Sequence, residues 1–185
     1  AAWLGEAIPW RHPRESELPT PSGRAESLTT TNLTDDGNAR AIVLMFGDRI
    51  RFVQGLGVWR VWTGTRWKND SDGQVERYAV EVAKARYLAA RDVMDDDRRK
   101  KMAAWSIGSE SQGKVLAAMD ALKRQPEIAT QLETWDADPW IIGLQNGVFD
   151  LRNEKVLPPD PARLVSMSLG PTYDAKAKCP RSERF

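Results

Sequence analysis

The fold of this chain is decided by residues 49–67, which read RIRFVQGLGVWRVWTGTRW. β-Branched and aromatic residues form two short runs in this stretch, and glycines separate them. Short β-rich runs around a glycine turn are typical of an antiparallel hairpin. We therefore predict a short helix through Phe46, a strand from Arg49 and a hairpin that closes by Trp67.

The sequence changes to a helical pattern downstream of the hairpin. Apolar residues recur at helical spacing from Val75 to Val93, which predicts an amphipathic helix. Two Ser-x-x-Gln patterns, typical of capping boxes, predict helix starts; they are Ser71 with Gln74 and Ser109 with Gln112. Pro126 suits the first turn of a third helix. That helix would carry three apolar residues: Ile128, Leu132 and Trp135.

A second β-rich region follows Asp138-Pro139. Short apolar runs at 140–144, 148–151 and 155–157 are separated by turn residues and predict a small β element. The expected fold class is therefore α+β, with a β-hairpin, a helical centre and a small C-terminal β element. Five residues of this last element are expected to be core: Trp140, Ile142, Val148, Phe149 and Leu151.

Residues 1–38 differ in composition from the rest of the chain. They are rich in proline, serine, threonine and acidic residues and show little periodicity, which predicts a linker or the remnant of a preceding domain. Residues 39–185 are then expected to form one domain. A chain of 185 residues with 41% apolar residues can bury one real core.

Composition excludes several classes of protein. The sequence has no apolar run near the roughly 18 residues of a transmembrane helix and no secretory signal pattern at its start. One cysteine, Cys179, excludes an internal disulfide framework, and one histidine, His12, leaves too few ligands for the usual zinc site. With a net charge of +1, the chain is expected to be soluble and intracellular.

The segment from Gly108 to Lys114 has the glycine and lysine spacing of a phosphate-binding loop. Such a loop follows a buried strand and needs Ser or Thr after the lysine, but residue 115 is valine and the preceding residues are helix-like. A helix–turn–helix connection explains the same glycines. We expect that connection and no ATP site in this chain.

Basic and aromatic residues alternate in residues 40–68, where six cations stand against one carboxylate. Indoles can stack on unpaired bases while nearby cations follow the phosphates. We predict a nucleic-acid surface made of Trp59, Arg60, Trp62, Arg66, Trp67 and Lys68. The alternative is that the tryptophans face a core and the arginines coat the outer face.

Residues 127–154 have the opposite charge, with six carboxylates against one arginine. This polarity could steer a head-to-tail contact between neighbouring copies. Three of the acidic residues could instead converge on magnesium as part of an enzyme: Asp136, Asp138 and Asp150. Turn chemistry explains Asp138 before a proline, and no base or nucleophile stands out, so we predict no catalytic residues and no metal site.

Residues 132–151, LETWDADPWIIGLQNGVFDL, resemble the signature of the domain that precedes the helicase in phage, plasmid and poxvirus-type DNA primase-helicases. In that family, an LD-x-DP element leads into a hairpin with NG, two hydrophobic residues and DL. A TG-x-RW hairpin lies upstream and is matched by residues 63–67. Residues 158–161 and 173–180 resemble the family's lead-in to its helicase, although Ser182 stands where tryptophan is frequent. The resemblance covers residues 40–185.

The resemblance implies a DNA replication protein of a mobile element or virus, working in the cytoplasm of a bacterial host. Family members join a primase to a hexameric superfamily-three helicase, and the intervening collar assists oligomerisation and guides single-stranded DNA. Residues 39–185 would be that collar, and residues 1–38 a linker or primase remnant. The sequence stops before the helicase, so the ATP and magnesium of the motor are not expected as cofactors here.

The expected function is therefore that of a non-catalytic domain beside an ATP-dependent motor. Its partners would be single-stranded DNA, other copies of the chain and the adjacent primase and helicase domains, but no membrane. Two alternatives stay open: a stand-alone single-stranded DNA-binding protein and a pure protein-interaction module.

Overall fold

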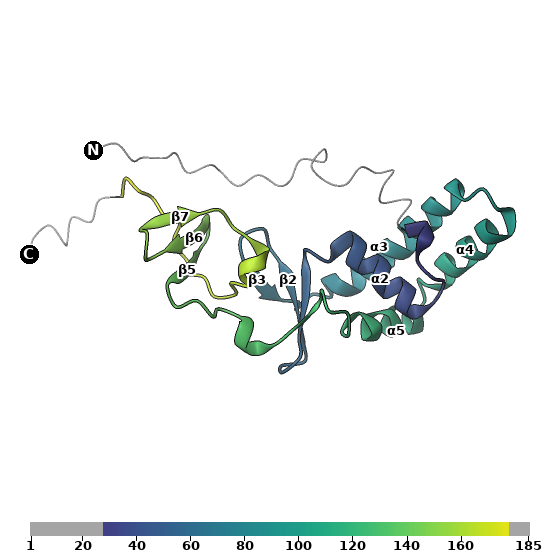
Figure 1. The fold of residues 1–185 in the computed structure, drawn as a ribbon, viewed down its shortest axis with the longest axis horizontal. Coiled ribbons are helices and arrows are strands. Elements are labelled where there is room, and N and C mark those ends of the chain that lie inside the picture. Colours follow the sequence, from purple (N-terminus) through teal and green to yellow (C-terminus); the bar gives the residue numbers. More distant parts are fainter. Residues whose placement is uncertain (1–27, 178–185) are drawn as a thin grey trace, which may run out of the picture.

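A computed structural model describes residues 28–177 of the chain (Figure 1). The helices gather at one end of the molecule, a three-stranded sheet lies at the other, and a four-stranded sheet stands between them (Figure 1). The predicted α+β class is thereby confirmed. Residues 1–27, most of the predicted linker, lie outside the described part. Within residues 28–177, no helix is both long and apolar enough to cross a bilayer.

Four α-helices, seven strands and three 3₁₀ turns have defined bounds within residues 28–177. The helices are α2 (Asp35–Phe46), α3 (Gln74–Ala89), α4 (Asp96–Gly108) and α5 (Gln112–Leu122), and the 3₁₀ turns are η1 (Ala90–Asp92), η2 (Leu132–Thr134) and η3 (Pro161–Arg163). The strands are β1 (Ile50–Val53), β2 (Val58–Trp62), β3 (Trp67–Asn69), β4 (Ala129–Thr130), β5 (Ile141–Leu144), β6 (Gly147–Asp150) and β7 (Lys155–Leu157).

The four-stranded sheet has the strand order β3-β2-β1-β4. The predicted strand from Arg49 is confirmed as β1, which pairs antiparallel with β2, and the predicted hairpin that closes by Trp67 is confirmed as β2 and β3. β4 is parallel to β1 and comes from the segment predicted to be a third helix, so that prediction was wrong. The backbone there bonds to the sheet instead: Phe52 N donates to Ile128 O at 2.9 Å and Gln54 N to Thr130 O at 3.0 Å.

The two predicted capping boxes were also wrong in their residues. The Asp70 carboxylate accepts from the backbone N–H groups of Gln74, at 2.8 Å, and Val75, at 2.9 Å, so it satisfies the start of α3 in place of Ser71. A charged carboxylate can accept hydrogen bonds from two N–H groups, and each of these bonds is stronger than one to a neutral serine hydroxyl. Ser109 ends α4, and Ser111 stands at the N-cap of α5. The predicted helix–turn–helix connection is confirmed.

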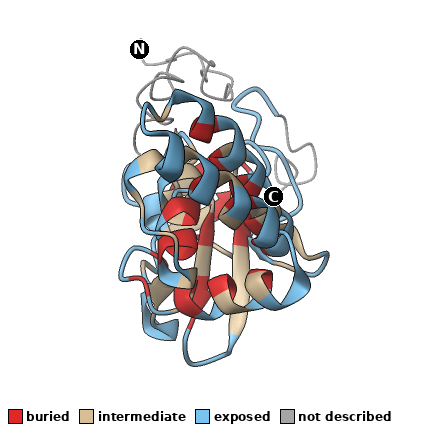
Figure 2. Cartoon of the chain, turned by 90° about the vertical axis from the view of Figure 1, so that its right-hand side faces the viewer, coloured by how far each residue is buried: buried red, intermediate tan, exposed pale blue. Residues whose placement is uncertain are grey.

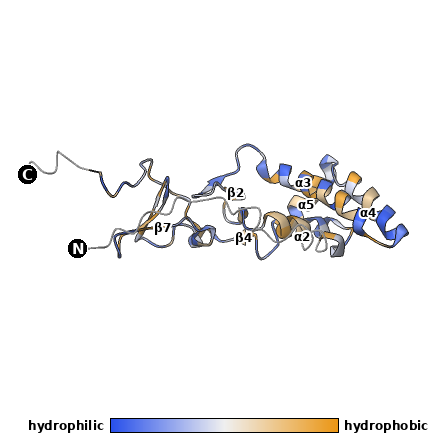
Figure 3. Ribbon diagram, turned by 90° about the horizontal axis from the view of Figure 1, so that it is seen from above, coloured by the Kyte–Doolittle hydropathy of each residue, from blue (hydrophilic) through white to orange (hydrophobic). Residues whose placement is uncertain are grey.

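The larger core lies between the helices and one face of the four-stranded sheet. Buried residues line the inside of the helical end, and apolar stretches run along α2, α3 and α5 (Figures 2 and 3). Leu28 belongs to this core, and the Thr34 hydroxyl caps α2 by accepting from Gly37 N at 3.0 Å. The predicted linker therefore extends too far, because residues 28–38 pack into the folded part.

A buried arginine connects residues 28–38 to the helices. Arg86 on α3 is fully buried and donates to the backbone carbonyls of Thr31, at 3.1 Å, and Asn32, at 3.0 Å. It also donates to Asn38 Oδ1, which accepts from Trp105 Nε1 at 3.1 Å. Asn38 Nδ2 donates to Ser109 Oγ at 3.0 Å. Burial lowers the pKa of Arg86, and within residues 28–177 no carboxylate pairs with it.

We predict that Asn38→Ala destabilises the protein by about 2–4 kcal/mol, because it leaves several buried polar groups unpaired at about 1–3 kcal/mol each. Urea unfolding followed by circular dichroism measures this change. Gln112→Ala, at an exposed position at the start of α5, is the control and should change stability by less than about 0.5 kcal/mol. Equal stabilities of the two variants would contradict the role of Asn38.

The three-stranded sheet is an antiparallel meander with the order β5-β6-β7. The expected core residue Val148 is buried, and Ile142 and Phe149 are half-buried. Trp140 is 51% exposed and Leu151 41% exposed, so placing these two in the core was wrong. They lie opposite each other just beyond the last register pair of β5 and β6, where Leu151 N donates to Trp140 O at 2.9 Å.

Candidate nucleic-acid interface

The predicted nucleic-acid residues lie on β2, β3 and the turn between them. Thr63 closes this turn: its hydroxyl donates to Arg66 O at 2.8 Å, and its backbone N–H donates to the same oxygen at 2.9 Å. Gly64 has φ of 96°, which a side chain would strain. The tight turn holds the backbone of Arg66 in place while its side chain stays exposed.

Strand alternation places the tryptophans of β2 on opposite faces of the sheet. Trp59 is half-buried on the face that carries the helices, with its ring 4.9 Å from Phe52, centroid to centroid. Trp62 lies on the other face, half-buried beside Trp67 at 5.5 Å. The two indoles of β2 therefore cannot act as one continuous stacking platform.

Trp67 is a core residue. It is 1% exposed and packs edge-on against Trp135, with ring centroids 5.7 Å apart. Its backbone N–H donates to Val165 O at 2.9 Å, and its Nε1–H donates to Pro161 O at 3.0 Å. An indole enclosed in this way offers no face to a base, so for Trp67 the geometry favours the alternative that it faces a core.

Two arginines share the face of Trp62 and Trp67. Arg60 Cζ lies 4.2 Å from the centroid of the Trp135 ring, and Arg51 Cζ lies 5.1 Å from that of Trp67. Burial lowers the pKa of Arg60, and the charge of Asp136 opposes that shift. These side chains do not coat an outer surface, because indoles hold them against the sheet.

Arg66 and Lys68 are the exposed cations of the predicted set. Neither makes an ion pair among the residues that the structure describes. In contrast, Arg40 pairs with Glu127 at 3.1 Å, and Arg49 lies 4.0 Å from Asp48. The exposed cations of this region that make no ion pair in the described chain therefore lie at β3 and the turn before it.

The three aspartates considered for magnesium are each engaged locally. Asp136 accepts from Ser166 N at 2.7 Å and Ser166 Oγ at 2.5 Å, while Asp150 accepts from Arg152 N at 2.9 Å. Asp138 accepts from both terminal nitrogens of Arg152, at 2.7 and 3.0 Å. From residue 28 to 177, no group of three potential metal-binding side chains lies together. The hydrogen bonds of these three carboxylates therefore hold turns and neighbouring segments of the chain in place.

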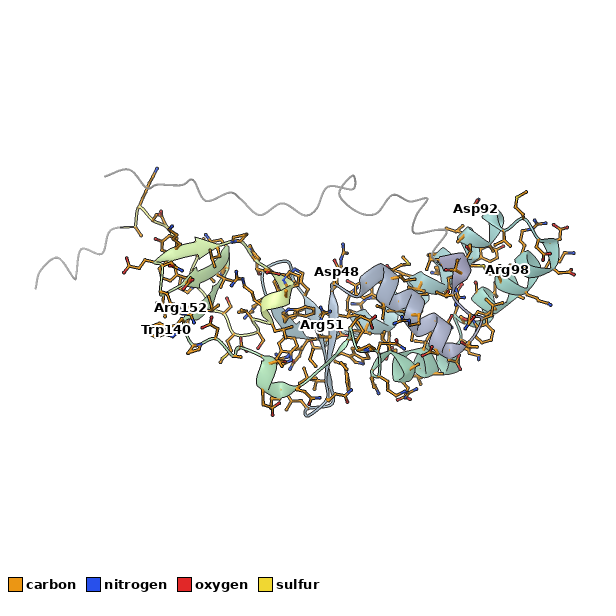
Figure 4. The ribbon with its side chains drawn as sticks, in the orientation of Figure 1. Asp48, Arg51, Asp92, Arg98, Trp140 and Arg152 are labelled. Carbon is orange, nitrogen blue, oxygen red and sulfur yellow. The ribbon has the colours of Figure 1, made fainter. Side chains whose placement is uncertain are left out.

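The sequence reasoning missed an exposed aromatic site at the other end of the molecule. Trp140 and Arg152 lie together at the edge of the three-stranded sheet (Figure 4). Arg152 Cζ is 5.9 Å from the Trp140 ring centroid, and Asp138 fixes both residues by bonding the guanidinium and accepting from Trp140 N at 3.1 Å. The sequence Asp138-Pro139-Trp140 predicts a turn, but no neighbouring residue in the sequence indicates that the Trp140 indole is exposed.

The Asp138–Arg152 pair generates a pH prediction. The Arg152 guanidinium, together with the Trp140 N–H, holds the pKa of Asp138 below the ordinary value of an aspartate. Because the pKa of Asp138 is lower in the folded state, the pair stabilises the fold at pH values above the ordinary aspartate pKa. This stabilisation is lost as the pH falls through the folded-state pKa.

We expect Arg152→Gln to raise the Asp138 pKa towards its ordinary value, about 3.9, as measured by NMR titration of the carboxyl carbon. Arg124→Gln, which breaks the pair with Asp120 on α5, is the control and should leave Asp138 unchanged. An Asp138 pKa that is the same in Arg152→Gln and the parent would contradict the assigned cause.

Comparison with known proteins agrees with the sequence signature. Residues 39–185 match the family described as D5 N terminal like. The match covers most of the chain, so the chain belongs to this family, the N-terminal domain of D5-type primase-helicase proteins. The predicted resemblance is confirmed. A comparison with curated proteins gives no match.

Proposed function

We propose that this chain is a non-catalytic domain of a DNA replication protein that supports self-association and guides single-stranded DNA beside an ATP-dependent helicase motor. Membership of the D5 N-terminal family supports the replication context. A phage or plasmid origin and the cytoplasm of a bacterial host are part of the same proposal. The adjacent primase and helicase domains would be its partners within the parent protein.

The observation that carries the DNA proposal is the pair of exposed cations on the β2–β3 hairpin. Arg66 and Lys68 are within two residues of each other, and neither makes an ion pair with a carboxylate in the described chain. Trp67, between these two cations in the sequence, is buried, whereas Trp62 at the start of the same turn is half-buried. Cations that follow phosphates beside an aromatic residue suit single strands, whose bases are free to stack.

Self-association is supported by charge polarity along the molecule. The hairpin region is basic, whereas residues 127–154 carry six carboxylates against one arginine. Surfaces of opposite sign on one chain attract the next copy in a head-to-tail manner, and such a heterologous contact closes a ring when the rotation allows. A ring is the form that would enclose a DNA strand.

We expect the chain to bind a labelled single-stranded oligonucleotide more tightly than duplex of equal length, and less tightly as salt rises. The double variant Arg66→Ala, Lys68→Ala should lower the slope of log affinity against log salt by about 1.4, or about 0.7 for each phosphate contact on a single strand. Fluorescence anisotropy at several salt concentrations measures both quantities.

The double variant Lys100→Ala, Lys101→Ala is the matched control, because it also removes two exposed cations, from α4 at the far end of the molecule. It should bind as the parent does. A parent that fails to bind at low salt would remove DNA guidance from the proposal. Equal salt slopes for the double variant and the parent would place the contact elsewhere.

A protein-interaction module is the second candidate, and the exposed apolar side chains at the three-stranded sheet favour it. Trp140 and Leu151 form an uncovered cross-strand pair there, and Met167 is 69% exposed. Exposed apolar residues that gather at one place mark interaction surfaces. Sedimentation without DNA, compared between the parent and Trp140→Ser, distinguishes this candidate: loss of self-association in the variant alone supports it.

A further inference from the structure

A polar row crosses the four-stranded sheet on the face opposite the helices. The register pairs Arg51 of β1 with Arg60 of β2, and Arg60 with Asn69 of β3. Residues that are register partners in a sheet point to the same side. Two arginines and one asparagine therefore lie on one face across three strands, with Arg51 near the Trp67 ring and Arg60 on the Trp135 ring.

The two arginines of this row, Arg51 and Arg60, make no ion pair within residues 28–177. Like charges directly opposite each other destabilise a sheet. Asp48, the carboxylate that acts on Arg51, lies closer to Arg49, and it stands at the same end of the sheet as Arg51 (Figure 4). Asp136, the carboxylate that acts on Arg60, is engaged by Ser166.

Both guanidinium groups are held in fixed positions. Arg60 rests on Trp135 at 4.2 Å, and among residues 28–177 its Nε and Nη1 are enclosed without a hydrogen-bond partner. Arg51 rests near Trp67, and its Nη1 donates to Ile50 O at 2.7 Å and to Gly47 O. Each cation is restrained before any ligand arrives, which lowers the entropy cost of binding.

We propose that Arg51, Arg60 and Asn69 form a binding row for a phosphate group. A phosphate would neutralise two adjacent cations at once, and a charged guanidinium N–H forms a strong hydrogen bond to a phosphate oxygen. The row lies on the sheet that carries the exposed cations Arg66 and Lys68, and Lys68, as the register partner of Val61, points to the other face of that sheet. The inference rests on the proposed function in one respect: it takes the backbone of a DNA strand as the source of the phosphate. A free nucleotide offers the same chemistry and is the other source.

The test compares three probes with the same chain: inorganic tripolyphosphate, ATP without metal, and an oligodeoxynucleotide built of abasic sites. Abasic DNA retains phosphodiesters and lacks bases, so it reports phosphate contacts without stacking. Calorimetric titration at low salt gives each affinity for the parent, Arg51→Gln, Arg60→Gln and the conservative Arg60→Lys. Arg124→Gln on α5 is the control with the same loss of charge away from the sheet.

We expect each glutamine variant to bind abasic DNA at least tenfold more weakly than Arg124→Gln does. Arg60→Lys should recover only part of the affinity, because it retains the charge and loses the planar group that rests on the Trp135 ring. Unfolding midpoints and near-ultraviolet circular dichroism verify that the variants keep the tryptophan packing. If Arg60→Gln alters that packing, the affinities of Arg51→Gln and Asn69→Ala are compared with that of Arg124→Gln instead.

The outcomes separate this inference from the proposed function. If intact single-stranded DNA binds but Arg51→Gln and Arg60→Gln match the control on every probe, the phosphate row is wrong and DNA guidance stands. If DNA fails to bind while tripolyphosphate or ATP binds in an Arg51- and Arg60-dependent manner, the row is right and its source is a free phosphate compound. A parent that binds none of the three probes overturns the row.

Discussion

The enclosure of Trp67 is the constraint on which the arrangement of the molecule depends. Its indole occupies the face of the four-stranded sheet opposite the helices, and its two N–H groups bond to the carbonyls of Pro161 and Val165. A residue from the early hairpin is thereby tied to a segment almost a hundred residues later in the chain. Because this contact covers the second face of the sheet, the strands become a layer between two cores.

Indoles in this protein also serve as supports for cations. Arg60 rests on Trp135, Arg51 lies near Trp67, and Lys114 Nζ lies 4.4 Å from the Trp105 ring. A ring face restrains a charged side chain without neutralising it, whereas a carboxylate does both. The abundance of tryptophan, eight residues in 185, is therefore connected to the placement of positive charge as well as to packing.

Local patterns in the sequence were sufficient to predict the hairpin, the helix from residue 74 and the meander, because apolar periodicity and turn residues are local properties of the sequence. The segment after Pro126 shows where this information ends. Its apolar spacing at 128, 132 and 135 imitates a helix, but the parallel edge of β1 binds its backbone. Exposure was equally undetermined: Trp67 is covered by residues 161–165, whereas no described segment covers Trp140 to the same degree.

The parallel pairing of β1 with β4 has a consequence for how the chain reaches its native state. Strands β1 to β3 are neighbours in sequence and can pair quickly. In contrast, α3, α4 and α5 separate β4 from them in the sequence, between Asn69 and Ala129. Closing a loop of that length has an entropic cost that local pairing avoids. Helices α3, α4 and α5 thus form an insertion whose two ends are fixed to one sheet, and we expect the fourth strand to dock after these helices have become compact.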